Sequence, residues 1–313
     1  MKFSFKLKGS DWFGLYLAVI VFYIVPVVAM QLLGRAIKED PGNISNMLAI
    51  FCLMVVMMLA ILILATPILR KIIGGVCLND QPFTYSGKTG EFVLLNIGRG
   101  LLSLITLGIY APWYATRLLK YLAGRTSFHN ASLSFNGKGF HLFGLLLATL
   151  VFPLIPYSVA VAAIGKGLIG NIWFAVVNQA VVVLILIPYM YFVYKWSVNA
   201  GYRGYSIRWE TQALPSMGMI LLQILLTIIT LGIYYPVALA KIYAYFMSRT
   251  VAREQGSGGY SFNASFNYFG VWKTVWAQIL LTVITCGIYG AWAYCRVIRV
   301  FVDNTSVKKL ETI

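Results

Sequence analysis

The chain of 313 residues is too apolar for a soluble protein. Hydrophobic residues make up 60% of it and charged residues 11%, and the mean hydropathy is +0.79. A soluble domain carries about a quarter charged residues. The composition therefore predicts a polytopic membrane protein, whose net charge of +16 fits an excess of bases on the cytoplasmic side.

The first long apolar segments lie near the N-terminus. Asp11 to Gly34 and Met47 to Leu69 each exceed the roughly 18 residues that span a hydrocarbon core, so both are predicted to be transmembrane helices. The first follows a basic stretch, but it is longer than the apolar part of a secretory signal and no small-residue cleavage pattern follows it. It is therefore predicted to be a retained anchor. We assign residues 1–82 to an N-terminal two-helix membrane segment.

One phrase occurs three times in the rest of the chain, as LITLGIY, IITLGIY and VITCGIY. Its glycine can end a helix in the left-handed conformation that other residues resist, and its tyrosine suits a membrane interface. In two copies a proline follows, in the first turn of the next helix, where no N–H is needed. The phrase therefore predicts a corner between two helices. The residues assigned to the corners are Gly108, Tyr110, Pro112, Gly232, Tyr234, Gly287 and Tyr289.

The chain around each corner is repeated as well. Short stretches with alternating aromatic residues precede the units, and this alternation predicts short strands. They are FTYSG from Phe83, SLSFNG from Ser132, YSIRW from Tyr205 and YSFNASF from Tyr260. A further copy, which lacks the corner, is placed by aligning Pro188 with the corner tyrosines. The first eighty residues carry no matching motif. The predicted membrane domain of residues 83–313 contains units at about 83–126, 132–204, 205–250 and 260–305.

The predicted fold is an all-α polytopic membrane protein, with internally repeated transmembrane helix hairpins and short cytoplasmic β-strands between them. Two passes followed by four hairpins give about ten crossings, with both termini in the cytoplasm. Most bases then lie inside, and Arg35, Lys38 and Lys166 lie outside, as the positive-inside rule requires. The second helices are short, because Tyr110 to Thr126 corresponds to roughly 24 Å. The sequence leaves open whether these helices cross the bilayer fully.

Polar side chains inside the apolar helices are the candidate binding residues. A base stands seven residues after each corner tyrosine, and a polar residue stands eleven before it. Ionisable groups within a membrane are costly and indicate function, and a basic cluster with few acids predicts an anion or a lipid head group as ligand. The candidates are Arg99, Arg117, Lys120, Lys241, Arg296, Arg299, Gln223 and Gln278. The alternative is structural: these bases reach toward the interface or tie the hairpins together.

The sequence shows no pattern of catalytic, metal-binding or cofactor-binding residues. His129 and His141 have no Cys or acid partner at metal-ligand spacing, and no two carboxylates stand at catalytic spacing. The four cysteines form no Cys-x-x-Cys pair. We therefore expect no enzyme activity, no metal and no cofactor. Because the positive charge follows the inner membrane boundary, membrane lipids are the expected partners and nucleic acid is not.

The stretch FTYSGKTGEFVLLN, followed by LITLGIYAPWYATRLLKYLAGRTSF and SFNGKG, resembles the YjgN-type family of bacterial inner-membrane proteins. Members of that family repeat an aromatic strand, a Leu-Gly-Ile-Tyr-x-Pro-Trp corner and a basic end. The resemblance covers the chain from Phe83 onward, although Pro112-Trp113 stands in the first unit alone. It implies a location in the bacterial inner membrane. The family is of uncharacterised function, so the resemblance implies no activity.

Two functional hypotheses follow from the sequence. The first is a transporter or channel-like protein that handles an anionic or lipidic molecule, with repeats around a polar interior. The second is a non-transporting membrane scaffold or lipid-binding module, whose cytoplasmic strands offer an edge to a partner. Neither the ligand nor the oligomeric state follows from the sequence.

Overall fold

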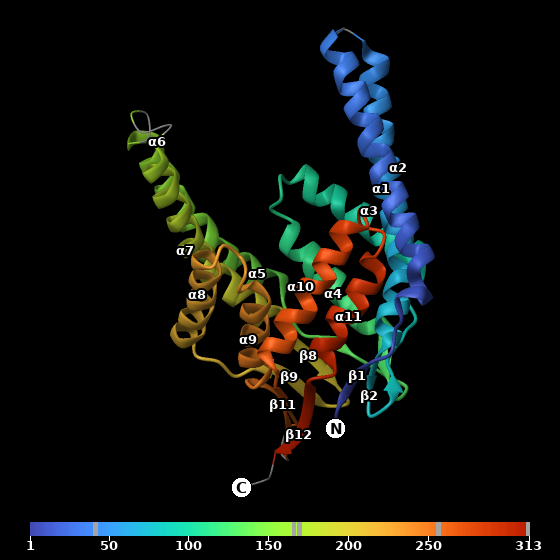
Figure 1. The fold of residues 1–313 in the computed structure, drawn as a ribbon, viewed down its shortest axis with the longest axis vertical. Coiled ribbons are helices and arrows are strands. Elements are labelled where there is room, and N and C mark those ends of the chain that lie inside the picture. The colour runs from blue at the N-terminus through green and yellow to red at the C-terminus, as the bar shows by residue number, and fades with distance from the viewer. Residues whose placement is uncertain (40–42, 165–166, 168–170, 255–257, 311–313) are drawn as a thin grey trace.

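Helices make up most of the protein, and short strands gather at one end of it (Figure 1). The computed structural model describes residues 1–39, 43–164, 167, 171–254 and 258–310. The N-terminus and the last strand, β12 (Thr305–Leu310), lie together at the end with the strands, which we call the strand end. The opposite ends of the helices are called the tips. The described residues form five helix pairs, numbered here in chain order.

Within the described residues, four helices are long and apolar enough to cross a membrane. The first pair consists of α1 (Gly9–Glu39) and α2 (Ile44–Gly75), so the two predicted N-terminal helices are confirmed as helices. The third pair consists of a segment in three parts and α7 (Ile172–Ser197). The three parts are α5 (Gly139–Leu146), the π-helical turn η1 (Leu147–Val151) and α6 (Phe152–Ile164).

Two prolines explain the π-helical turn. Pro153 and Pro156 lack the N–H that would bond to the carbonyl group four residues earlier, so the hydrogen-bond ladder widens in the preceding turn. In this segment the Thr149 hydroxyl donates to the carbonyl oxygen of Leu145 at 2.7 Å. The helical path therefore continues past both prolines and reaches the full length of a membrane span.

The other three pairs are shorter. Each consists of a first helix of 17 residues, a corner, and a second helix of 13 to 15 residues. The second pair is α3 (Thr89–Ile105) and α4 (Ala111–Arg125), the fourth is α8 (Ala213–Ile229) and α9 (Tyr235–Met247), and the fifth is α10 (Tyr268–Ile284) and α11 (Gly290–Val302). Figure 1 shows these pairs ending below the tips of the two long pairs, and furthest below the tip of the first pair.

Two antiparallel strands close each helix pair at its base. They are β1 (Phe3–Phe5) with β2 (Val76–Leu78), β4 (Thr84–Tyr85) with β5 (Thr126–Phe128), β7 (Ser134–Phe135) with β8 (Asn199–Tyr202), β9 (Tyr205–Trp209) with β10 (Thr250–Arg253), and β11 (Gly259–Ala264) with β12. The four aromatic stretches that predicted strands each contain one. Short strands β3 (Gln81–Pro82) and β6 (Ala131–Ser132) pair with β2 and β5.

One backbone hydrogen bond recurs at the base of all five pairs. The N–H after the first strand donates to the carbonyl oxygen of the residue just before the second strand, or in the third pair of that strand's first residue, at 2.8 to 3.3 Å. The bonds run from Lys6 to Gly75, Ser86 to Arg125, Asn136 to Asn199, Glu210 to Arg249 and Ser265 to Asn304. The first pair therefore has the same base as the others, although its sequence carries none of their motifs.

The five pairs form a closed circle. Each second helix packs against the first helix of the next pair, and α11 packs against α1. At the strand end β1 lies beside β12, where Lys2 and Ser306 form a β-bridge and the Val307 N–H donates to the Met1 carbonyl oxygen at 2.8 Å. Apolar contacts support this junction, because Trp12 of α1 is buried against Ala291 of α11. The two ends of the chain therefore meet.

The strand register corrects the sequence alignment of the copy without a corner. Thr126 and Ala200 hold equivalent places, since each pairs with the last residue of the strand that opens its helix pair. Counting back sixteen residues from Ala200, the spacing between Tyr110 and Thr126, gives Leu184. The alignment on Pro188 was wrong by four residues, about one helical turn. The reason is that α7 is one continuous helix without a corner to fix the comparison.

Candidate functional site

The three corners share one backbone geometry. The φ angles of Gly108, Gly232 and Gly287 are +87°, +87° and +89°, in the region that favours glycine. A threonine four residues before each tyrosine supports the turn: its hydroxyl accepts the tyrosine N–H at 3.0 to 3.1 Å and donates to a carbonyl oxygen one turn earlier at 2.8 Å. Pro112 lies in the first turn of α4. Local hydrogen bonds therefore hold each corner.

Each corner tyrosine also bonds to the polar residue eleven positions before it. The Tyr234 hydroxyl donates to Gln223 Oε1 at 3.1 Å, and Gln278 accepts the same bond from its own tyrosine at 3.1 Å. Arg99 donates to the tyrosine of the second pair. Both glutamines are buried. These bonds explain why a polar residue stands in each apolar helix, since they tie the helix to the corner.

The bases seven residues past the corners lie in three different helix pairs. Arg117 is exposed on α4, with Lys120 exposed beside it. The Lys241 ammonium lies 5.5 Å from the ring centroid of its own corner tyrosine and 5.6 Å from that of Tyr268 on α10. The Arg296 guanidinium lies 5.8 Å from the ring of its corner tyrosine. Lys241 and Arg296 therefore lie over separate corners, and Arg117 belongs to a third helix pair.

A pocket with a volume of about 540 Å³ lies between α10 and α11. Three of the predicted residues, Gln278, Arg296 and Arg299, line it. The other lining residues are Lys273, Thr274, Ala277, Val300, Asp303 and Asn304. Three bases against one acid give the lining a formal charge of +2, which suits an anion. The fifth pair therefore carries the candidate site.

Sequence reasoning missed two charged residues of this pocket. Lys273 is the one charged residue of α10, and a single base in an apolar helix of 17 residues was the signal that could have found it. Asp303 follows Arg299 by four residues, so that both lie on one face of the helix end. Neither residue has a counterpart in the other corners, which is why a comparison of repeats passed over them.

The charged groups of the pocket differ in how they are bound. Arg299 donates through Nε to the Phe5 carbonyl oxygen and through Nη2 to that of Leu7, both at 3.0 Å, and Asp303 accepts the Phe5 N–H at 2.7 Å. These two side chains therefore tie α11 to the start of the chain. Within the described part of the chain, Lys273 and Arg296 make no ion pair and donate no hydrogen bond. They are the charges that a ligand can engage.

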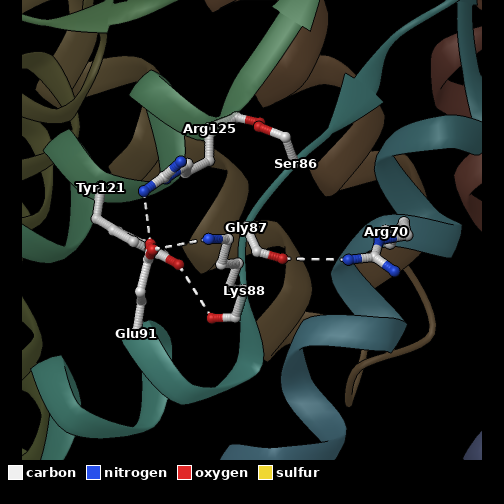
Figure 2. Close-up of polar contacts among 7 residues, drawn as sticks. All are labelled: Arg70, Ser86, Gly87, Lys88, Glu91, Tyr121 and Arg125. Carbon is white, nitrogen blue, oxygen red and sulfur yellow. Dashed lines mark hydrogen bonds and ion pairs between the residues drawn. The ribbon is translucent and has the colours of Figure 1, made fainter.

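A second charged cluster lies at the strand end of the second pair (Figure 2). Glu91 Oε2 accepts a hydrogen bond from Arg125 Nη2 at 2.5 Å. Arg70 of α2 donates to the Gly87 carbonyl oxygen at 3.2 Å, which ties the first pair to the second. Beside this cluster, burial raises the pKa of Tyr85 to about 12, so the hydroxyl is neutral at neutral pH. The bases drawn in Figure 2 are engaged by the protein itself.

Among residues 1–39, 43–164, 171–254 and 258–310, no three His, Cys, Asp or Glu side chains are placed to hold a metal ion. The absence of a metal, a cofactor and an enzyme activity stays a prediction from the sequence.

These observations define an integral membrane protein made of apolar helix pairs, with a basic pocket in one of them. A family described as "Bacterial protein of unknown function (DUF898)" matches residues 80–252, more than half of the chain, and the chain belongs to this family. A second, described as "Family of unknown function (DUF6693)", matches residues 206–308.

A curated relative supports the same assignment. "Inner membrane protein YjgN" of Salmonella typhimurium (strain LT2) is 28% identical over 164 residues, which cover 49% of this chain and 40% of that protein. The match thus spans less than half of the relative's length. No solved structure matches the chain. The resemblance to the YjgN-type family, of uncharacterised function, is confirmed.

Proposed function

We propose that the protein crosses the bacterial inner membrane four times and that its three short helix pairs enter the membrane without crossing it. The short pairs contain helices of 13 to 17 residues, which are roughly 20 to 25 Å long. A hydrocarbon core is about 30 Å thick, so these helices fall short of the far side. This proposal replaces the expectation of about ten crossings.

The tips of the short pairs support this placement. Leu107 and Leu231, the residues before the corner glycines, are 93% and 92% exposed on the protein surface. Ile105, Ile229 and Ile284 are 74% to 76% exposed. Such a dense apolar tip is unfavourable in water and favourable in lipid, at about 25 cal/mol per Å² of apolar surface. The tips therefore belong in the hydrocarbon core.

The distribution of bases supports a cytoplasmic strand end. Bases such as Lys6, Lys88, Arg125 and Lys308 belong to the strands or to the helix ends beside them. At the opposite end of α1 the described bases are Arg35 and Lys38. The positive-inside rule then places the strands, the N-terminus and β12 in the cytoplasm. The five helix pairs with their common base are on this view five internal repeats, of which the first and the third lack the corner sequence.

Cysteine labelling tests the depth of the tips. Cys286 is an exposed native residue that takes the place of Leu107 and Leu231 in the last corner. In a variant without the other cysteines, Cys286 should not react with a membrane-impermeant thiol reagent applied to intact cells after permeabilisation of the outer membrane. Cysteine introduced at Asn43, beside the far end of α2, should react. Equal reaction at both positions would show that the fifth pair crosses the membrane.

The activity we propose is the binding and transport of an anionic or lipidic molecule at the pocket of the fifth pair. The observation that carries this proposal is that Lys273 and Arg296 line a pocket of about 540 Å³ and, within the described residues, make no ion pair and donate no hydrogen bond. Bases left unpaired at a membrane boundary attract anions.

Ligand-dependent stability tests the binding step. Purified protein should gain thermal stability when an anionic phospholipid or inorganic phosphate is added, because a ligand that binds the folded state stabilises it. A variant with Lys273→Gln and Arg296→Gln should lose that gain. A variant with Arg117→Gln and Lys120→Gln removes two exposed bases of another pair and should keep it. If neither anion stabilises the wild type, the proposal is wrong.

A second candidate function, a membrane scaffold, is favoured by a different observation. In the described residues the strands form three sheets, and β4, β5 and β6 are hydrogen-bonded neither to β3 nor to β7 in a ladder. Strand edges at such breaks accept an added strand from a partner. Amide hydrogen exchange tests this: the edges of β6 and β7 should be more protected in native membranes than in purified protein. Equal exchange would argue against a bound strand.

A further inference from the structure

The pocket of the fifth pair is lined mostly by polar side chains, and the surface of α10 between the pocket and the corner is apolar. Arg296 and Lys273 lie in the half of the helices nearer the strand end, whereas the corner at Gly287 is apolar. Eight residues separate Arg296 from Asn304 at the strand end, about 12 Å of helix, and nine separate it from Gly287, about 13 Å. Arg296 therefore lies halfway along α11, and Lys273, five residues after the start of α10, lies nearer the strand end.

This apolar surface continues the same face of α10. Leu281 and Ile284 follow Ala277 by four and seven residues, so all three lie along one stripe of the helix. Leu281 is 39% exposed and Ile284 is 76% exposed. A molecule that places an anion between the bases therefore finds an uncovered apolar surface directly above it. A free inorganic anion would use the bases and leave this stripe unused.

The depth of the bases matches the boundary of the hydrocarbon core. The polar head-group region adds roughly 5 to 7 Å on each side of a core of about 30 Å. If the strands lie in the cytoplasm, Arg296 about 12 Å above the strand end and Lys273 about 8 Å above the start of α10 reach the phosphates and glycerol groups of the cytoplasmic leaflet, since Lys and Arg extend several ångströms from the helix.

Resting on the proposed function, we propose that the ligand of this pocket is an anionic glycerophospholipid of the cytoplasmic leaflet. Its phosphate lies between the Lys273 ammonium and the Arg296 guanidinium, and its acyl chains lie along Leu281 and Ile284. Arg299 keeps its bonds to the backbone of Phe5 and Leu7 and shapes the pocket floor. A free phosphate can bind the same two bases, but it has no acyl chains to contact Leu281 and Ile284.

Native mass spectrometry of the full chain released from nanodiscs tests the polar half of this proposal. The nanodiscs contain phosphatidylglycerol and phosphatidylcholine in equal amounts. Wild type should retain phosphatidylglycerol, and Lys273→Gln with Arg296→Gln should reduce that retention about tenfold or more, because each change removes a charge-assisted contact with the lipid phosphate. The matched variant Arg117→Gln with Lys120→Gln removes two bases that do not line this pocket and should change the retention less than about twofold.

Photocrosslinking tests the apolar half and separates lipid from free phosphate. A phosphatidylglycerol with a diazirine in its acyl chain should label α10 at Leu281 or Ile284, and 10 mM inorganic phosphate should not displace it. Displacement by phosphate, or labelling that avoids α10, would overturn the lipid assignment while leaving an anion site. Equal loss of lipid in both double variants would overturn the pocket itself, and with it the proposed function.

Discussion

Replacing Gly232 by alanine should destabilise the protein through the backbone alone. Gly232 has φ +87°, and a Cβ built there meets no atom within 4 Å, so no clash accompanies the change. A non-glycine residue held in this region is strained by about 1 to 3 kcal/mol. The same substitution stabilises by roughly 0.4 to 1 kcal/mol, because alanine restricts the unfolded chain. The net loss should be about 0.5 to 2 kcal/mol.

Gly218 supplies the matched control. It lies inside α8, its added Cβ also meets nothing within 4 Å, and its φ is not positive. Gly218→Ala should stabilise by about 0.5 to 1 kcal/mol, as expected for glycine to alanine in a helix. The two variants share the unfolded-state effect, so their difference of roughly 2 kcal/mol isolates the strain at φ +87°.

Reversible unfolding in mixed detergent micelles, followed by tryptophan fluorescence, would measure both free energies of unfolding. Equal stability of Gly232→Ala and Gly218→Ala would refute the reasoning, because it would mean that the corner changes its path at no cost. A large loss in both would point instead to lipid or helix packing against α8.

Three further outcomes are expected. Tyr234→Phe should cost about 1 kcal/mol in the same assay because it removes a hydrogen bond to a buried glutamine, whereas Tyr235→Phe, at a side chain 47% exposed, should be near neutral. Because the pKa of Tyr85 is raised to about 12 in the folded protein, the free energy of unfolding should be constant below about pH 10 and fall as the pH rises toward about 12. In Tyr85→Phe the free energy of unfolding should therefore change less with pH in this range. Glu91→Gln should cost less than about 1 kcal/mol, an effect that salt suppresses, because its ion pair with Arg125 is partly exposed; a loss insensitive to salt would contradict this.

Much of the local structure could be predicted from the sequence because its causes are local. The positive φ of Gly108, the proline in the first turn of α4 and the alternation that makes β9 a strand each depend on a few adjacent residues. The two N-terminal spans follow from length and hydropathy alone. Such features need no knowledge of neighbouring elements.

The circle and the pocket could not be predicted in this way. The contact between α1 and α11 joins segments about 280 residues apart through apolar packing, and the β-bridge beside it is one that any alternating sequence can make. The first pair shares its base with the others through backbone hydrogen bonds, which leave no trace in side-chain motifs. The pocket includes Lys273, which has no counterpart in the other helix pairs, so a comparison of the repeats could not find it.

A base at a repeated position can serve the fold in one pair and a ligand in another, and its partners decide between the two. Arg70 and Arg299 hold equivalent places six residues before a base strand, and both donate to backbone carbonyl oxygens of the next pair. In α4 the same place holds Lys120, which is exposed. Buried backbone carbonyls need hydrogen-bond donors, and Arg70 and Arg299 supply them while joining neighbouring pairs. Arg296, one turn nearer the tip, meets no such carbonyl among the described residues, and of the three bases seven residues past the corners it is the one that lines the pocket of the fifth pair.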